Sequence, residues 1–205
     1  MKVYIITQNF PPKIGGIQTV MFSVAKELSS MGNEVNVFPD NRFFGNETFK
    51  VTNVFSPKIF RQYIKKLLLS IKDHKESMVV CDTWKSVNAV PKKFKNIIVF
   101  AHGQEFLKLK NKKRILSSLL RTKVLITSSN YTLNLIKSNW NISHINSNII
   151  YPTYHIKKTK VEKKPSNKVT RFISICRIEK RKGLLQSLMA LKKIDLKGYD
   201  FFWDI

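Results

Sequence analysis

The sequence predicts an α/β protein with a doubly wound parallel sheet of Rossmann-like type, followed by the start of a second, smaller α/β unit. Short apolar runs alternate along the chain with amphipathic stretches. The runs are apolar throughout instead of alternating, which is typical of parallel strands buried on both faces. The hydrophobic content of 43% over 205 residues is enough to form a core and argues against disorder.

Six apolar runs are the predicted strands of the main sheet, and we expect helices on both faces of that sheet. The strands are Lys2–Thr7, Glu34–Phe38, Met78–Cys81, Ile97–Ala101, Lys123–Thr127 and Asn148–Tyr151. The clearest helix is predicted from Ile17 to Met31, where apolar residues recur at helical spacing, and Gly32 follows as a C-cap.

A change in composition divides the chain into an N-terminal domain of residues 1–154, a linker of residues 155–169 and a second part of residues 170–205. The linker is polar, rich in lysine and contains Pro165. The second part reads as strand "RFISIC", loop "RIEKRKG", helix Leu184–Lys193 and a last strand in "YDFFWDI". Since few residues remain for this second domain, we expect the sequence to be cut off.

The charge balance favours anionic partners. Lys and Arg number 37 against 13 Asp and Glu, a net charge of +24, and such a field attracts nucleic acid, anionic lipid or phosphorylated substrates. A general lysine-rich bias of composition is the alternative. Cys81 and Cys176 both lie in apolar runs, so they predict buried thiols and a reducing, cytoplasmic location.

The stretch "NFPPKIGGIQT" joins the first strand to the first helix and is the first candidate site. Glycine lets a ligand approach the unpaired N–H groups at a helix N-terminus, where the helix dipole is positive. Gly15 and Gly16 therefore predict an anion cradle. A tight turn that needs glycine for its backbone conformation is the structural alternative.

A second strand–helix corner, "RIEKRKG", places Arg177 and Lys182 five residues apart before Gly183. Two cations at a helix start suit a diphosphate. A solvated charged loop is the alternative. Because one such corner opens each domain, the pair predicts a phosphate site in a cleft between two lobes.

Four stretches in this order, "FPPKIGGIQT", "AHGQEF", "SSNYT" and "ICRIEKRKG", resemble the retaining glycosyltransferases of the GT-B fold, family-four type. The first is similar to that of the bacterial mannosyltransferases that act on phosphatidylinositol mannosides. The resemblance covers Met1 to about Gly183. It implies a nucleotide-sugar donor, with mannose as the first candidate sugar, a glycan or lipid-linked acceptor, and no cofactor or metal.

The resemblance also implies roles for particular residues. Gly15 and Gly16 would lie under the donor diphosphate and sugar, and His102 would contact the transferred sugar as the catalytic residue. Glu105 would sit beside the acceptor, and Arg177 with Lys182 would hold the leaving diphosphate. Fixed cations and a helix N-terminus would stabilise the charge of that leaving group without a metal.

Structural alternatives stand beside these roles. His102 can be a hydrogen-bonded residue at a strand end, and Glu105 can accompany a helix start. Ser128 and Ser129 are expected to be an N-cap for "NYTLNLIK", with a ligand role as the alternative. The lysine cluster Lys108–Arg114 is either solvated or faces the anionic inner surface of a membrane.

Two departures from the family pattern count against a working enzyme in this chain alone. "YPTYHI" lacks the glycine and aspartate expected there, and the donor-binding glutamate pair would fall beyond Ile205. We therefore expect poor donor binding and little turnover. A non-catalytic acceptor-binding domain and a basic nucleic-acid-binding protein are the rival functions, although no zinc, RNA-recognition or helix-turn-helix pattern accompanies the charge, so no nucleic-acid partner is expected.

Overall fold

The computed structural model describes residues 1–107, 111–151, 169–176 and 178–205. The chain divides into two compact units, Met1–Tyr154 and His155–Ile205, each treated separately below. The predicted linker lies almost wholly outside the described residues, so its limits stay a prediction.

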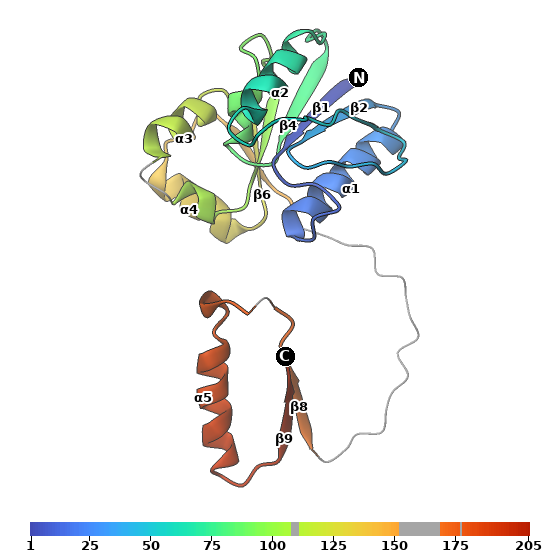
Figure 1. Cartoon of the computed structure of the whole chain (residues 1–205). Coiled ribbons are helices and arrows are strands. Elements are labelled where there is room, and N and C mark those ends of the chain that lie inside the picture. Colours follow the sequence, from blue (N-terminus) through green and yellow to red (C-terminus); the bar gives the residue numbers. More distant parts are fainter. Residues whose placement is uncertain (108–110, 152–168, 177) are drawn as a thin grey trace. The chain divides into compact units, whose positions relative to one another are not determined.

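The first unit is a Rossmann-like α/β fold built on a seven-stranded parallel sheet in the order β3-β2-β1-β4-β5-β6-β7 (Figure 1). Its strands are β1 Lys2–Thr7, β2 Glu34–Pro39, β3 Lys50–Val51, β4 Ser77–Cys81, β5 Ile97–Ala101, β6 Val124–Thr127 and β7 Asn146–Ile149. Its α-helices are α1 Gly16–Ser30, α2 Arg61–Ser70, α3 Lys112–Leu119 and α4 Asn130–Asn139, and the 3-10 helices are Ser86–Ala89 and Gln104–Phe106. The predicted parallel α/β architecture is confirmed.

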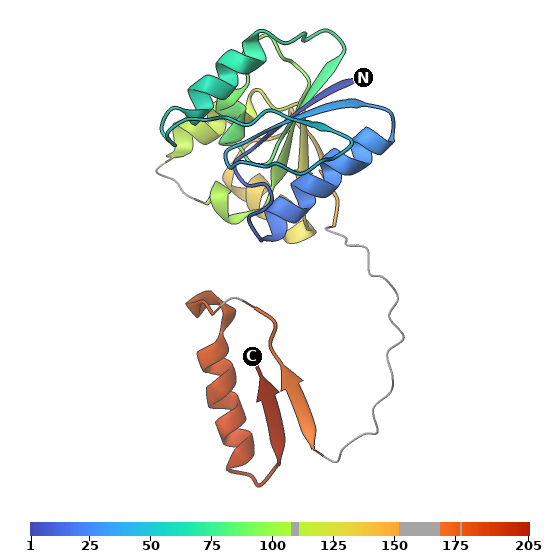
Figure 2. The ribbon, with the colours of Figure 1, turned by 45° about the vertical axis from the view of Figure 1, so that its right-hand side comes forward.

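The helices cover the two faces of this sheet unequally, as Figures 1 and 2 both show: α1 lies on one face, and α2, α3 and α4 lie on the other. Helices α2, α3 and α4 share one buried apolar cluster with the strands, to which they contribute Leu69, Ile115 and Ile136. Met21 and Ala25 of α1 pack over β1 and β2 in the other cluster.

The expectation of a sheet covered on both faces is therefore only half right. On the α1 side, Ile98, Phe100 and Ile126 are only partly buried, and they line a groove of about 530 Å³ beside α1. The apolar runs predicted burial correctly on one face, but among the described residues one helix is too few to cover seven strands on the other.

Element boundaries follow local chemistry. Helix α1 ends as predicted, with Gly32 at φ 80° and its N–H donating to the Ser29 carbonyl at 3.0 Å. The last strand of the sheet is shifted from the prediction: β7 is Asn146–Ile149, because it pairs in register with β6, where Thr127 faces Ile149.

The second unit is small. Strands β8 Thr170–Ile173 and β9 Phe201–Asp204 form a parallel pair, and between them lie a 3-10 turn, Lys180–Lys182, and α5 Leu184–Asp195. This strand–helix–strand order agrees with the predicted start of a second α/β domain. Leu191 is the single fully buried apolar residue among those described in this unit. Cys176, predicted to be buried, is partly exposed, whereas Cys81 of the first unit is buried.

Candidate functional site

The candidate site lies where the strand order reverses. The chain runs from β1 outward to β2 and β3 and then returns to β4 on the opposite side of β1. In open α/β sheets, ligands bind at the carboxyl ends of the strands at such a switch point. The residues that follow β1, β4 and β5 meet there.

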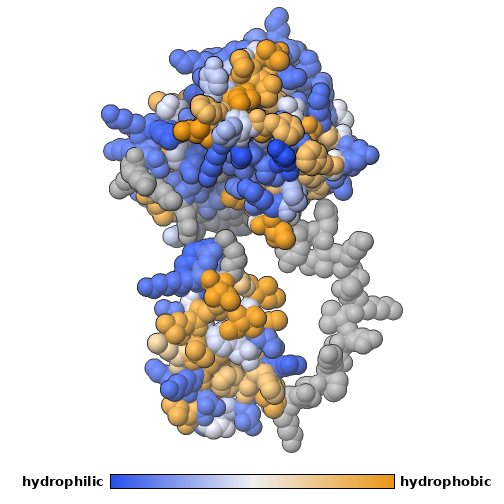
Figure 3. Space-filling model, viewed as in Figure 1, coloured by the Kyte–Doolittle hydropathy of each residue, from blue (hydrophilic) through white to orange (hydrophobic). Residues whose placement is uncertain are grey.

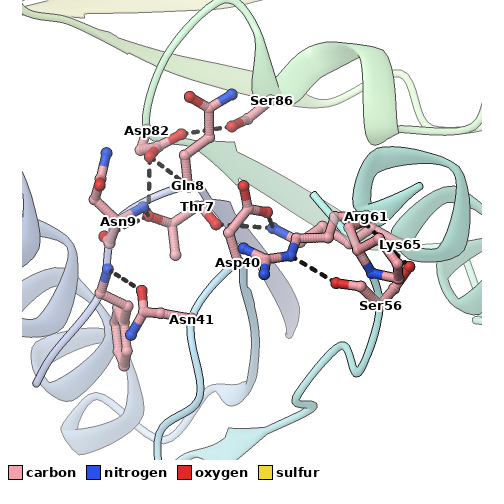
Figure 4. Close-up of polar contacts among 12 residues, drawn as sticks. Thr7, Gln8, Asn9, Asp40, Asn41, Ser56, Arg61, Lys65, Asp82 and Ser86 are labelled. Atoms are coloured by element: carbon pink, nitrogen blue, oxygen red, sulfur yellow. Dashed lines mark hydrogen bonds and ion pairs between the residues drawn. The ribbon is translucent and has the colours of Figure 1, made fainter. Parts of the chain in front are cut away.

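Asp82, directly after β4, ties the loop after β1 in place (Figure 4). Its Oδ2 accepts a hydrogen bond from the Gln8 N–H at 2.7 Å and lies 2.9 Å from Thr7 Oγ1, and its Oδ1 accepts from Ser86 Oγ at 2.5 Å. The carboxylate is completely buried. Burial raises the pKa of Asp82, while the hydrogen bonds from Ser86, Gln8 and Thr7 oppose that rise.

A buried lysine of α2 completes this network. Lys65 Nζ donates to the Thr7 carbonyl at 2.8 Å and forms an ion pair with Asp40 Oδ1 at 2.5 Å. Burial lowers the pKa of Lys65, and the Asp40 carboxylate acts in the opposite direction. No sequence pattern singles out Asp40, Lys65 or Asp82; the fold brings all three together.

The rest of the loop is held from the opposite side by Asn41. Its Oδ1 accepts from the Phe10 N–H at 3.0 Å, and its Nδ2 donates to the Pro11 carbonyl at 2.8 Å. Phe10 is fully buried against the rings of Phe22, Phe43 and Phe49. The Pro11–Pro12 peptide bond is cis. The contacts of Asp82 and Asn41 therefore fix the path of the loop from Gln8 to Pro11.

Gly15 and Gly16 form the start of α1, as predicted: Gly15 is the N-cap and Gly16 the first helical residue. A Cβ built on Gly16 would have no heavy atom within 4 Å, so packing within the protein does not require glycine there. The first turn of α1 contains no acidic residue that would neutralise the helix N-terminus. These features are compatible with an anion cradle, which stays a prediction.

His102 follows β5 and is positioned by the same aspartate. Its Nε2 lies 3.1 Å from the Asp82 carbonyl oxygen. Because a carbonyl only accepts, this contact requires the proton on Nε2 and leaves Nδ1 as the acceptor of the neutral ring. Asp82 thus joins the glycine loop, through its carboxylate, to His102, through its main chain.

Glu105 has a structural task that the sequence suggested as an alternative. Its Oε1 accepts a hydrogen bond from the His102 N–H at 2.7 Å across a tight turn. Gly103 within this turn has φ 105°, a conformation that favours glycine, and a Cβ there would lie 3.4 Å from Thr132 Oγ1. The carboxylate therefore holds the turn that presents His102, and its acceptor-side role stays a prediction.

The remaining predicted residues fall in three places. Ser129 is the N-cap of α4, where its side chain accepts from the Thr132 N–H, so that prediction is confirmed. Ser128 and His102 lie among the residues that line the groove beside α1. In the second unit, Lys182 is exposed in the turn before Gly183, and Arg177 lies outside the described residues. The lysine cluster is described only from Asn111 onward, in the first turn of α3.

Among the described residues, no group of three His, Cys, Asp or Glu side chains is arranged to hold a metal ion. None of the described helices is long and apolar enough to cross a bilayer. The absence of a metal cofactor stays a prediction.

A site at the switch point of a Rossmann-like sheet is where α/β proteins commonly bind nucleotides. No family model matches the chain, and no curated protein matches it. Solved structures do match. WaaG, a glycosyltransferase involved in lipopolysaccharide biosynthesis, has a TM-score of 0.66 and 14% identity, covering 100% of this chain and 64% of its own.

Two further structures give the same picture. A glycosyltransferase from Rickettsia africae ESF-5 matches with a TM-score of 0.61 and 20% identity, over 98% of this chain and 59% of its own. An E. coli structure described as trehalose-6-phosphate bound with UDP-2-fluoro glucose matches with a TM-score of 0.65 and 11% identity, over 99% of this chain and 64% of its own. The neighbours are GT-B glycosyltransferases. The predicted resemblance is confirmed for the fold, and this chain spans less than two thirds of each neighbour.

Proposed function

We propose that this chain takes part in transferring a sugar from a nucleotide-sugar donor to a glycan or lipid-linked acceptor. The observation that carries the proposal is the double attachment of Asp82. One buried residue holds both the start of the loop that leads to Gly15 and Gly16, where the donor diphosphate would bind, and the histidine that would meet the sugar. Two groups that must act on one substrate are thereby held at one end of the sheet.

The proposed roles follow from charge and geometry. The unpaired N–H groups at Gly16 and the next residues of α1 would stabilise the diphosphate as it leaves with growing negative charge. His102 would accept a sugar hydroxyl at Nδ1, since Nε2 donates to Asp82. Arg177 and Lys182 would neutralise the same diphosphate, with no metal. Mannose as the sugar, retention of configuration, the family-four assignment and a cytoplasmic location with lysine clusters against an anionic membrane belong to the same proposal.

The first experiment is an NMR titration of the ¹⁵N-labelled chain with UDP, GDP and their sugar conjugates. We expect weak binding that shifts the amides of residues 15–18 and the ring of His102. Gly16→Ala places a methyl group in the open space at the helix start, so it should weaken binding about tenfold, a loss typical of one blocked contact, without unfolding the chain. Lys26→Ala, on the exposed part of α1, is the matched control.

The alternatives give different results. Shifts confined to other parts of the chain, or equal binding by Gly16→Ala and the unchanged chain, would overturn the proposed donor site. Binding without transfer to any added acceptor would favour a binding domain. Tight association with unspecific DNA that persists near about 0.2 M salt would favour the nucleic-acid alternative.

A further inference from the structure

Helix α2 and its two ends expose large apolar side chains to solvent. Five large apolar residues of the α2 region are between 56% and 82% exposed. They are Ile59, Phe60, Tyr63, Leu67 and Ile71. Tyr63 and Leu67 are four residues apart within α2, so they lie on one side of the helix, and Ile59, Phe60 and Ile71 flank its two ends; together they form the stripe. We call these five residues the α2 outer face.

The opposite side of α2 explains why this face cannot turn inward. Lys65 and Leu69 are the buried residues of the helix. Lys65 is bonded to Asp40 and to the Thr7 carbonyl beneath the sheet end, which fixes the rotation of α2 about its own axis. The buried side of the helix therefore holds a charged residue together with Leu69, and an apolar stripe occupies the solvent side.

Figure 3 shows apolar atoms gathered over α2, with hydrophilic side chains around them. Glu47 and Asp73 are the acidic residues nearest to this region in the sequence, so residues 48–72 contain no carboxylate side chain. The same stretch has basic residues at six positions, of which Lys58 and Lys66 are exposed beside the stripe. Lys93 adds positive charge at the far end, where its Nζ donates to the Ser70 and Lys72 carbonyls at 2.7 Å.

We propose that the α2 outer face is a docking surface for an anionic lipid bilayer. Apolar side chains on one face with lysines at their edge are the pattern of helices that lie in the membrane interface. The stripe would enter the boundary between headgroups and acyl chains, while Lys58 and Lys66 would contact lipid phosphates. The lysine cluster near α3 is a different surface. Docking by α2 does not depend on the proposed sugar transfer, and its test contains no sugar.

The charge pattern decides between a bilayer and other partners. A face that pairs with a second copy of itself would bring Lys58 and Lys66 of two molecules together, and like charges at an interface oppose association. An anionic surface makes the same lysines favourable. The bilayer therefore uses both the stripe and its flanking charge.

The test is sedimentation of the full chain with vesicles of phosphatidylcholine containing increasing phosphatidylglycerol. We expect binding that grows with the anionic fraction and weakens with salt. Replacing both Tyr63 and Leu67 by Ser should lower the partition coefficient about tenfold or more, because their buried apolar area drives insertion. Lys66→Glu should lower it as well. The matched control replaces Leu120 and Tyr131 by Ser, which are as exposed but lie outside α2, and should change binding less than about twofold.

Equal losses in the control and in the α2 variant, or no loss in either, would overturn the proposal. So would analytical ultracentrifugation showing a dimer that the α2 variant dissociates, because a second copy would then cover this face. As a direct measurement, Tyr63→Trp should be quenched by brominated lipids beyond the quenching of the unchanged chain. No added quenching would place α2 outside the bilayer and overturn the proposal. Indole NMR signals of Trp84 and Trp140 verify that each variant is folded.

Discussion

The corner after β1 and the corner after β8 have the same plan in sequence, a strand, a loop and a glycine at a helix start, yet they differ in how they are held. In the first unit, the loop contacts Asp82, Asn41 and the buried ring of Phe10. In the second unit, the described loop side chains are largely exposed, and the side-chain contacts there include a hydrogen bond from Trp203 Nε1 to Ser174 Oγ and the ion pair of Arg181 with Glu179.

The difference shows that such a strand–loop–helix corner is held rigid by side chains from neighbouring strands. Asp82 reaches the first loop from β4, and Asn41 reaches it from the end of β2. The described part of the second unit has two strands and so offers fewer neighbours. Each indole N–H is hydrogen-bonded, Trp84 and Trp140 in the first unit and Trp203 in the second, so the three indole signals report on the two units separately.

Asp82→Ala should give the largest effect. The Gln8 N–H and the Ser86 hydroxyl lose their acceptor, and each unsatisfied group costs about 1–3 kcal/mol, so we expect a loss of about 4 kcal/mol in the unfolding free energy of the first unit. Urea unfolding followed at the indole signals measures it, with Trp203 as the reference. Asp73→Ala is the control, because Asp73 pairs with Lys2 at the surface, and it should change little. Equal losses of unfolding free energy in Asp82→Ala and Asp73→Ala would show that Asp82 does not hold the first corner.

Lys65→Met should be next, with a loss of about 3 kcal/mol, because it leaves the Asp40 carboxylate without its cation near the buried end of β2. The same urea experiment applies. Lys66→Met is matched in chemistry and adjacent in sequence but exposed, so it should leave the urea midpoint almost unchanged. A similar midpoint for both variants would mean that the buried network does not brace the first corner.

The pH dependence of unfolding sharpens the same point. Because burial raises the pKa of Asp82 above its ordinary value of 3.8 in the folded state, the folded chain binds this proton more tightly than the unfolded chain. The stability of the unchanged chain should therefore rise relative to Asp82→Asn as pH falls through the raised pKa toward 3.8, by at most about 1.4 kcal/mol per pH unit. Parallel stability curves for the two chains would contradict this.

The glycines should separate the two corners by about 1 kcal/mol. Gly183 has φ 71°, so Gly183→Ala forces a left-handed alanine and should destabilise the second unit by about 1 kcal/mol. Gly16 lies in open space at a helical position, so Gly16→Ala should leave the first unit as stable as before. Hydrogen exchange at Trp203 and Trp84 measures both, and the reverse ranking would contradict the description of these corners.

Arg181→Ala should have the smallest effect. Its Nε lies 2.6 Å from Glu179 Oε2, but the two side chains are 46% and 34% exposed, and exposed pairs contribute about 0.5 kcal/mol or less. Exchange at Trp203 should change less than it does in Gly183→Ala. A larger change would show that the second corner is held by this ion pair and would bring the two corners closer in kind.

Local chemistry could be predicted from the sequence where neighbours along the chain decide it. The bounds of β1 and β5, the C-cap at Gly32 and the N-cap at Ser129 all depend on nearby residues. The contact of Thr7 with Asp82 could not be predicted, because 75 residues separate them and only the strand order brings them together.

The exposed face of α2 could not be predicted from the sequence either, for a different reason. Amphipathic patterning places apolar residues inside, yet here the buried side includes Lys65, whose partner Asp40 comes from another strand end. With that ion pair unknown, the spacing of Tyr63 and Leu67 would indicate the buried side instead of the exposed one. The roles of Gly16, His102 and Lys182 toward a substrate stay predictions, which the proposed binding experiment tests.

The groove beside α1 also affects how this protein should be handled at the bench. Its walls, Val24, Val80 and Phe100 among them, are mostly apolar and are open in the native state. Environment-sensitive dyes that report unfolding by binding exposed apolar surface should bind here before any heating. A dye-based melting curve would then start bright and understate the transition, so circular dichroism is the better first choice for comparing variants.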